Sequence, residues 1–420
     1  MSGSFTQVGE QAWQWLEAAA HYSETDDPAR EGVTRRCATP EHHALLEALR
    51  DWMEALGMTV RLDNGANLIG RHASPHPEAR TLLLGSHQDT VPHGGKYDGI
   101  MGVLLPLALV KYLKDNAITL PFHLDVVAFS DEEGTRFSST LLGSKVLAGT
   151  FDAAMLETTD DEGISLGQAL EAFGCRPERI AEDAYRPEEV IAFLETHIEQ
   201  GPQLEREALP VGVVSAITGI ERHRLTVLGR AGHAGTVPMA MRQDALVGAA
   251  EVIRLVDTLC RETEDLVGVV GKIENAPNGV NVIPQTTTLS IELRSPKDEI
   301  RRRAREQLMA QIEDSLTRRG LTFDAQLTYE QAAVACSAWL KGELEDSVRE
   351  SGITPRVLFS GAGHDGLAMQ SLCDIGMLFL RCAGGVSHHP DEAIQPEDLT
   401  AAVQVLVTTC RNLARREAAA

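Results

Sequence analysis

Residues 216–330 constrain the fold most strongly, because their order of elements differs from that of the chain on either side. Alternating apolar residues predict strands at 222–229, 267–273, 286–293 and 322–329. Apolar residues at helical spacing predict helices at 243–260 and 298–319. This β-α-β-β-α-β order is typical of a ferredoxin-like α+β domain, so we expect residues 215–330 to form a compact inserted domain.

The segments that flank this insertion alternate between strands and helices. Strands are predicted at 81–85, 122–129 and 376–381, and helices at 40–56 and 103–113. Such alternation is typical of a mixed sheet covered by helices, in which loops at the carboxyl ends of strands are free to hold ligands. We therefore expect an α/β domain that is discontinuous in sequence, formed by residues 1–214 and 331–420.

The overall composition argues against several classes of function. The chain has 420 residues and a net charge of −23, which disfavours binding to nucleic acid or to an anionic membrane surface. It has no apolar run of about 18 residues, and its first residues lack the pattern of a secretory signal. The seven scattered cysteines include no CxxC pair, so we expect a reduced, cytoplasmic protein.

Polar residues follow the first predicted strand. His87 and Asp89 form an H-x-D motif directly after it, and Asp98 lies further on in a glycine-rich loop. In such a motif the histidine can bind a metal ion while the aspartate orients its ring. The motif alone is weak evidence, however, and an ordinary turn with a capping aspartate would explain Asp98 equally well.

Three adjacent carboxylates, Asp131, Glu132 and Glu133, follow the predicted strand at 122–129. A run of acids is usually a solvated surface. After a strand that should be buried, a bound cation explains the clustering better. Because adjacent side chains point in different directions, one glutamate can bind metal while the other acts as a base toward water.

Histidines occur at two later points in the chain. His197 lies in an apolar segment, where a histidine is more often a core residue than a ligand. His388 and His389 follow the strand at 376–381 and two glycines, and we expect one ligand there because adjacent residues diverge. Combined with the earlier motifs, these histidines fit two ions that share a bridging carboxylate, with a base for the shared water.

Two other segments bear on the site. Residues 360–366, SGAGHDG, contain GxGxxG but do not open a first βαβ unit, so we interpret them as a glycine-shaped loop rather than a dinucleotide motif. In the insertion, His233 lies in a glycine-rich segment, and Asn281 and Arg294 bracket a hairpin. An arginine at a strand end can hold a substrate carboxylate in a bidentate fork, and a surface salt bridge is the alternative.

Taken together, seven ordered motifs resemble those of the M20 metallopeptidase clan, and within it the amidase/hydantoinase/carbamoylase branch. The motifs are GSHQDTVPHGGKYDGIMG, FSDEEGTRF, HIEQGP, GHAGTVPMAMRQDAL, NVIP, SGAGHDG and GVSHHP, and the resemblance runs from about Gly32 to about Asp391. It implies an α/β catalytic domain and a smaller lid domain that also forms a homodimer. It further implies two divalent ions per subunit, manganese or zinc, with nickel or cobalt also compatible.

The resemblance also assigns roles to individual residues. The first ion would be held by His87, Asp98 and His197, and the second by Asp98, Glu133 and His388. Glu132 would be the general base, Asp89 would orient a ligand from behind, and His233 would reach across the dimer to the developing oxyanion. The polar groups and carboxylate of the substrate would be held by Gln200, Asn281 and Arg294.

Within this branch, FSDEEGTRF, AGTVPMAMRQDA and GMLFLRCAGGVSHHP look most like allantoate amidohydrolases. The resemblance therefore implies hydrolysis of allantoate to ureidoglycine, ammonia and carbon dioxide. N-carbamoyl-L-amino-acid hydrolases and β-ureidopropionase share most motifs and are the alternatives. A peptidase or aminoacylase of the clan is more distant, because those enzymes usually have a carboxylate at the place of His197. An inactive binding protein is the alternative from another class.

Two departures from the family pattern concern the substrate contacts. Gly366 stands where alanine is common, and Glu292 stands where aspartate is common. Neither departure removes an expected metal ligand, so both bear on substrate placement.

Overall fold

The computed structural model describes residues 4–417, and the chain divides into two compact units. The first unit comprises the residues up to Ser215, the segment Cys336–Leu358 and the residues from Ala362 onward. The second comprises Ala216–Ala335 and Phe359–Gly361. The catalytic and lid roles that we expect of these parts of the chain stay predictions.

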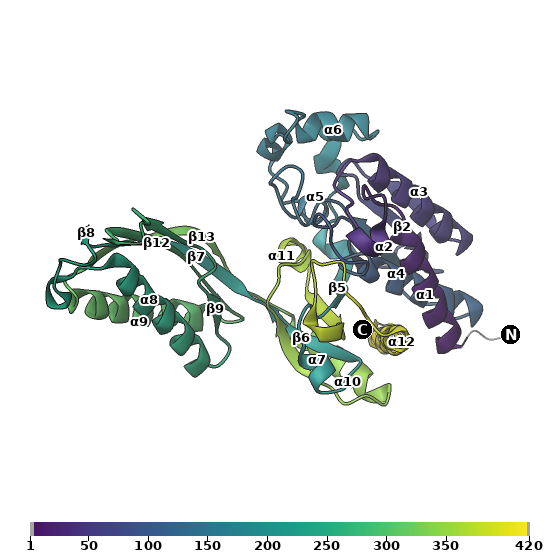
Figure 1. Cartoon of the computed structure of the whole chain (residues 1–420). Helices are drawn as coiled ribbons and strands as arrows, with labels where there is room; N and C mark the ends of the chain where they lie inside the picture. Colours follow the sequence, from purple (N-terminus) through teal and green to yellow (C-terminus); the bar gives the residue numbers. More distant parts are fainter. Residues whose placement is uncertain (1–3, 418–420) are drawn as a thin grey trace. The chain divides into compact units, whose positions relative to one another are not determined.

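A nine-stranded mixed sheet organises the first unit (Figure 1). Its strands, in the order of the sheet, are β1 (Thr59–Leu62), β2 (Leu68–His72), β4 (His123–Phe129), β3 (Thr81–His87), β5 (Val190–Ile198), β16 (Ile375–Leu380), β6 (Val211–Ile217) and β14 (Val334–Ala335), with β15 (Val357–Ser360) paired to β6. The four central strands β4, β3, β5 and β16 run parallel to one another. Their carboxyl ends therefore meet at one edge of the sheet, where ligand sites of α/β proteins lie.

Helices flank this sheet. They are α1 (Phe5–Ala19), α2 (Pro28–Glu31), α3 (Pro40–Ala55), α4 (Met101–Asp115), α5 (Leu142–Leu147), α6 (Leu166–Ala172), α7 (Gln203–Arg206), α10 (Ala338–Glu350), α11 (Gly366–Met369) and α12 (Pro396–Glu417). Short 3-10 turns are η1 (Ala153–Glu157), η2 (Pro177–Asp183), η3 (Pro187–Glu189) and η5 (Ala383–Gly385). The predicted helices at 40–56 and 103–113 correspond to α3 and α4, while α1, α10 and α12 had no predicted counterpart.

The central strands explain why the helices are needed. Every residue of β3, β4, β5 and β16 is buried, so both faces of this part of the sheet must be covered. Helix α4 is apolar almost all round and packs against β3, while α1 and α12 pack on α4 and on each other. Helices α1 and α12 approach closely at Gly9, where a Cβ atom would lie 2.2 Å from Oγ1 of Thr400. The strand ends are thus fixed by a rigid, helix-covered core.

The second unit is built on an antiparallel sheet with two helices on one face (Figure 1). Its elements are β7 (Gly219–Leu228), β8 (Gly232–His233), η4 (Met239–Met241), α8 (Ala245–Glu262), β9 (Val267–Val269), β10 (Ile273–Ala276), β11 (Val282–Ile283), β12 (Thr286–Ser295), α9 (Asp298–Thr317) and β13 (Thr322–Gln331). The five-stranded sheet has the order β10-β12-β7-β13, with β9 also paired to β12, and β8 pairs with β11 separately. Apolar residues of β7, β12, α8 and α9 form one core between sheet and helices.

One detail of the prediction for this unit was wrong. The strand predicted at 267–273 is two short strands, β9 and β10, which pair with different parts of β12 because the chain leaves the sheet between Val269 and Ile273. In α8, Val252 is buried, whereas the next apolar residue, Ile253, is 38% exposed. Among the described residues, no helix is long and apolar enough to cross a membrane.

Candidate metal centre

Six residues expected at a metal site lie together at the carboxyl edge of the central strands. His87 ends β3, His197 is the penultimate residue of β5, and Asp98 lies in the loop before α4. Glu132 and Glu133 follow β4, and His388 follows β16. Within the described residues, their ligand atoms form three groups: His87, Asp98 and His197; Asp98, Glu133 and His388; and His87, Glu132 and Glu133. The first two groups have the same members as the two ligand sets that the family resemblance implies.

The first group is fully buried and centred on one oxygen of Asp98. Nε2 of His197 lies 3.0 Å from Oδ1 of Asp98, and Nε2 of His87 lies 3.6 Å from the same oxygen. All three side chains are at most 6% exposed. Nε2 of His197 has no hydrogen-bond partner of ordinary geometry despite its burial. Nε2 of His87 and Nε2 of His197 thus point at the same carboxylate oxygen without a well-formed hydrogen bond to it. This is the arrangement expected of ligands that share a cation.

The tautomers of both histidines support this arrangement. Nδ1 of His87 lies 2.9 Å from the carbonyl oxygen of Asp89, and Nδ1 of His197 lies 2.9 Å from that of Ile198. A carbonyl can only accept, so each Nδ1 must carry the proton that it donates. Each Nε2 then keeps its lone pair, and the backbone bond fixes the ring orientation, as is usual for metal-binding histidines.

The second group uses the other oxygen of Asp98. Nε2 of His388 lies 3.1 Å from Oδ2 of Asp98 and 3.3 Å from Oε1 of Glu133. His388 is much more exposed than the buried histidines, with 49% of its side chain accessible. Asp98 thus offers one oxygen to each group, which is the geometry of a carboxylate that bridges two ions.

The electrostatics of the cluster favour positive charge. Burial opposes ionisation of Asp98, but contacts with His197, His388 and His87 hold its pKa well below the usual value. Contacts with Asp98 and Glu133 raise the pKa of His388 to about 10. The ring nitrogens therefore attract protons strongly, and a divalent cation would satisfy the same field. Imidazole and carboxylate donors suit zinc or manganese, so the residues present fit a pair of divalent ions.

Asp89 acts on the cluster through two different groups. We expected its carboxylate to orient His87, but the backbone carbonyl of Asp89 makes that contact. Oδ1 of the carboxylate lies 3.7 Å from Nδ1 of His87. Its carboxylate instead accepts hydrogen bonds from the backbone of Glu132 and of Glu133, each at 3.1 Å. Asp89 therefore fixes the loop that carries both glutamates. Burial raises the pKa of Glu132 well above its usual value, and the adjacent Glu133 adds to the effect.

A glycine makes room for the first histidine. A Cβ atom at Gly99 would lie 2.4 Å from Nδ1 and Cε1 of His87, and the backbone of Gly99 has a positive φ of 69°. Both conditions require glycine directly after Asp98.

Gln200 also lies at the cluster. Its amide nitrogen is 3.1 Å from Oδ2 of Asp98 and 3.1 Å from Oγ of Ser387. The residue has a positive φ of 55°, which holds it in a tight turn just after β5. In this arrangement the side chain contacts the proposed ligands, and its expected contact with substrate stays a prediction.

The remaining expected residues belong to the second unit. His233 pairs with Val282 in the small β8–β11 ladder, and the backbone carbonyl of Asn281 accepts a 2.9 Å hydrogen bond from Ala234. His233 and Asn281 are therefore neighbours. Arg294 lies near the far end of β12, where Nε donates to Glu292 at 2.6 Å and the guanidinium also donates to the carbonyl of Gly361. Arg294 is thus held on one side by an acid and a carbonyl.

Sequence reasoning missed three polar residues beneath the cluster. Glu195, fully buried on β5, accepts hydrogen bonds from Oγ of Ser86 at 2.8 Å and from the backbone of Gly366 at 3.2 Å. The ring of His364 contacts that of His197 edge-to-face at 4.4 Å, and Asp365 beside it is fully buried. Glu195 lies two residues before His197 on the same strand face, a spacing that could have revealed it.

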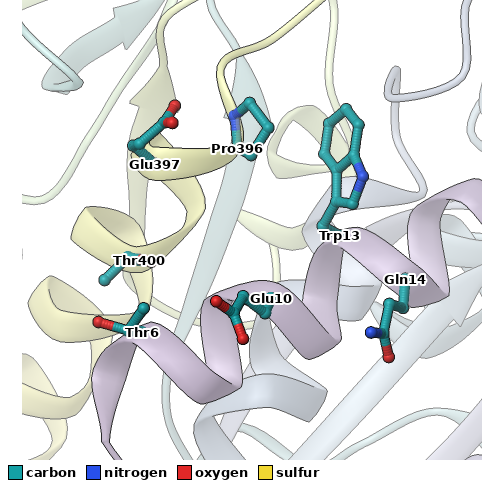
Figure 2. A pocket seen from close by; sticks show the side chains of 7 residues that line it. All are labelled: Thr6, Glu10, Trp13, Gln14, Pro396, Glu397 and Thr400. Atoms are coloured by element: carbon teal, nitrogen blue, oxygen red, sulfur yellow. The ribbon is translucent and has the colours of Figure 1, made fainter.

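A surface pocket of about 380 Å³ lies elsewhere in the first unit, between α1 and the start of α12. Figure 2 shows the side chains that line it: Thr6, Glu10, Trp13, Gln14, Pro396, Glu397 and Thr400. This lining contains no histidine or cysteine and none of the expected site residues. The chemistry-bearing side chains therefore lie at the strand ends and not in this pocket.

The family to which this chain belongs follows from comparison with known proteins. Residues 83–412 match Peptidase family M20/M25/M40, and the chain belongs to this family. Within it, the chain belongs to the hydantoinase/carbamoylase amidase branch.

Individual relatives carry more specific names. The chain is 37% identical over 409 residues to an N-carbamoyl-L-amino acid amidohydrolase of Geobacillus stearothermophilus, which covers 97% of this chain and 99% of the relative. It is 38% identical over 409 residues to an allantoate deiminase of Arabidopsis thaliana, covering 88% of this chain and 76% of the relative. An amidase of the hydantoinase/carbamoylase family from Burkholderia multivorans has a similar structure, with a TM-score of 0.90 and 30% identity over 97% of this chain and 98% of that chain.

Proposed function

We propose that this protein is a two-metal amidohydrolase that cleaves a ureido C–N bond. The observation that carries the proposal is the position of Asp98, whose two oxygens face two separate groups of potential ligands. Glu132 lies beside these groups and belongs to neither of the two that share Asp98. A bridging carboxylate, a ligand set on each side and a free glutamate are the parts that two-metal hydrolysis requires.

The residues of the chain would perform the proton transfers. Divalent ions held here would polarise the substrate carbonyl and lower the pKa of a shared water. Glu132 would take a proton from this water and later deliver it to the leaving nitrogen. Burial raises the pKa of Glu132, which favours proton uptake from the water and retention of the proton until it passes to the leaving nitrogen. His233 would stabilise the developing oxyanion, a contribution of about 3 kcal/mol for a well-placed donor.

The proposed substrate has a terminal ureido group and a carboxylate. Hydrolysis adds one water to R–NH–CO–NH₂ and gives R–NH₂, carbon dioxide and ammonia. We propose allantoate as the preferred substrate, which would give ureidoglycine. The similarity to an allantoate deiminase and the segments FSDEEGTRF, AGTVPMAMRQDA and GMLFLRCAGGVSHHP support this choice. Arg294, Asn281 and Gln200 would hold the carboxylate and polar groups.

N-carbamoyl-L-amino acids are the alternative substrates. N-carbamoyl-L-amino acid amidohydrolases of Geobacillus stearothermophilus and of a Pseudomonas strain are 37% and 35% identical to this chain. β-Ureidopropionate would be cleaved by the same chemistry. The choice among these substrates depends on pocket contacts that change selectivity by about 1–3 kcal/mol, so the mechanism would be the same for each.

We further propose that residues 215–330 form a ferredoxin-like lid that also joins two subunits. The order of strands and helices in the second unit supports the ferredoxin-like assignment. Exposed apolar residues on the outer face of α8, Leu246, Val247 and Ile253, support a role in association. In the dimer, His233 of one subunit would complete the site of the other. A monomeric variant that kept full turnover would contradict this role.

The proposed activity is tested by ammonia release from manganese-loaded protein. Allantoate, N-carbamoyl-L-amino acids, N-carbamoyl-β-alanine and ureidoglycolate are compared side by side, with metal-free protein as the control. A strong preference for allantoate supports the specific proposal. Preference for a carbamoyl amino acid keeps the reaction and changes the substrate. No ammonia from any of the four, with metal bound, would contradict the proposal and favour peptide or acyl-amino-acid substrates.

A further inference from the structure

Glu392 is a buried acid whose carboxylate ties together two loops of the metal centre. It lies beyond His388 in the last loop before α12 and is only 4% exposed. Its Oε1 accepts hydrogen bonds from the backbone of Tyr97 at 3.0 Å and of Asp98 at 3.1 Å. Its Oε2 accepts a 2.9 Å hydrogen bond from Oγ of Ser387. One carboxylate thus binds the residue before His388 and the backbone of the bridging aspartate.

These contacts belong to a closed circuit of hydrogen bonds. Oγ of Ser387 donates to Glu392 and accepts from the amide of Gln200 at 3.1 Å. The same amide nitrogen donates to Oδ2 of Asp98 at 3.1 Å, and the backbone of Asp98 donates back to Glu392. The circuit therefore links Asp98, Gln200, Ser387 and Glu392, which come from three loops that are far apart in the sequence. Such bonds behind metal ligands fix the positions of the ligands.

A glycine leaves the space that Glu392 fills. A Cβ atom at Gly95 would lie 2.1 Å from both Cδ and Oε1 of Glu392. Any side chain at this position would therefore displace the carboxylate from the backbone of Asp98. Gly95 provides a way to disturb the contact without removing a polar group.

We propose that Glu392 is a positioning residue that sets the spacing between Asp98 and His388 and so determines the affinity of the second ion. The inference rests on the proposed two-metal function. The first ion depends much less on Glu392, because His87 and His197 lie on the paired strands β3 and β5 and are oriented by backbone carbonyls. His388 has no such strand; it lies in a loop, has a positive φ of 55°, and is half exposed.

The test is titration of metal-free, full-length protein with manganese(II) alone, followed by calorimetry and by the electron paramagnetic resonance signal of the free ion. Glu392→Ala removes the carboxylate, whereas Ser387→Ala removes the hydrogen bonds of Ser387 to Glu392 and Gln200 and leaves the bonds that Glu392 accepts from the backbone of Tyr97 and Asp98. Gly95→Ala pushes the carboxylate away. Gly342→Ala, on α10, is the matched control, because a Cβ atom there meets nothing within 4 Å. The melting temperature of each metal-free variant is measured alongside.

We expect Glu392→Ala and Gly95→Ala to weaken the second ion by about 10- to 100-fold, and the first ion by a several-fold smaller factor. Ser387→Ala should have an intermediate effect, and it keeps the inference testable if Glu392→Ala does not fold. Glu392→Gln should recover part of the affinity, since its amide oxygen can still accept from the backbone of Asp98. Gly342→Ala should bind both ions as the wild type does.

Two results would overturn the inference. In the first, Glu392→Ala binds both ions with wild-type affinity. In the second, Glu392→Ala loses affinity for both ions equally and the metal-free variant melts at a lower temperature, which would indicate a purely structural role for Glu392. Failure of the proposed function is distinguishable from either result, because the wild-type protein itself would then bind fewer than two ions. That outcome would overturn the inference as well.

Discussion

Buried histidines in two regions of this molecule have opposite properties. His42, in α3, is completely buried, packs against Phe173, and accepts a hydrogen bond from the backbone of Ala38. Burial lowers its pKa to about 3, and the nearby Arg35 adds to the effect. His197 is equally buried, but the carboxylate of Asp98 outweighs the effect of burial and raises its pKa. Burial alone therefore keeps a histidine neutral, and an adjacent acid is needed to make its site attract positive charge.

The largest effect should come from removing Asp98, the acid that distinguishes the surroundings of His197 from those of His42. Asp98→Ala deprives both ligand groups of their shared member, so neither ion should stay bound. Turnover should fall on the order of a thousandfold or more, because bound ions contribute several kcal/mol to such reactions. Metal content by mass spectrometry and ammonia release measure the two effects, with Asp51→Ala on the exposed side of α3 as the control. Full metal content in Asp98→Ala would mean that the cluster does not hold the ions.

The next effect concerns proton transfer rather than metal binding. Glu132→Gln keeps the size of the side chain and should leave both ions bound, because Glu132 is not a member of either proposed ligand set. Turnover should fall by about a hundred- to a thousandfold, as expected for loss of a general base. The measurement pairs kcat with metal content on the same sample. Undiminished kcat with two bound ions would show that another group moves the proton.

A smaller effect is expected from removing His388, and the adjacent His389 provides the comparison. His388 faces Asp98 and Glu133, whereas His389 is exposed and contacts Asp391. His388→Ala should weaken the second ion by about a hundredfold and leave the first nearly unchanged. His389→Ala should bind both ions normally and serves as the matched control. Equal losses in the two variants, measured by calorimetric titration, would contradict the assignment of one ligand at this pair.

The smallest effect is on stability, and it tests the histidine outside the cluster. With a pKa of about 3 in the folded protein, His42 takes up a proton mainly on unfolding. The unfolded state then binds more protons below pH 6.5, so stability should fall as the pH is lowered through that value. The loss from this residue between pH 7 and pH 5 is about 2 kcal/mol. Urea unfolding of metal-free wild type and His42→Asn at both pH values measures it, and identical pH dependence would show that His42 is not kept neutral.

Much of the fold could be predicted because its signals are local. Alternation and helical spacing located β3, β4, β12, β13, α3, α8 and α9, and polar motifs after apolar strands pointed to the edge where His87 and His197 lie. The break between β9 and β10 was missed, since the apolar pattern continues across it. Local patterns cannot show where a chain leaves its partner strand.

Parts of the candidate site could not be predicted for a different reason. The sequence suggests that the carboxylate of Asp89 orients His87, but the contact is made by a backbone carbonyl, and every residue has one. Glu392 is ordinary in sequence, and its role is visible only once its loop meets the loop of Asp98. Packing between distant segments determines such contacts, and it produces no repeating pattern of residues in the sequence.

The place of β16 in the sheet has a consequence for synthesis of the chain. This strand, Ile375–Leu380, lies between β5 and β6, although both neighbours are made much earlier. At about 5–20 residues per second, the ribosome needs on the order of ten to forty seconds to reach β16 after completing β5. During that interval the edge of β5 beside His197 lacks its native partner. A nascent chain therefore passes through a stage in which the edge of β5 is unpaired and His388, which follows β16, has not yet been made.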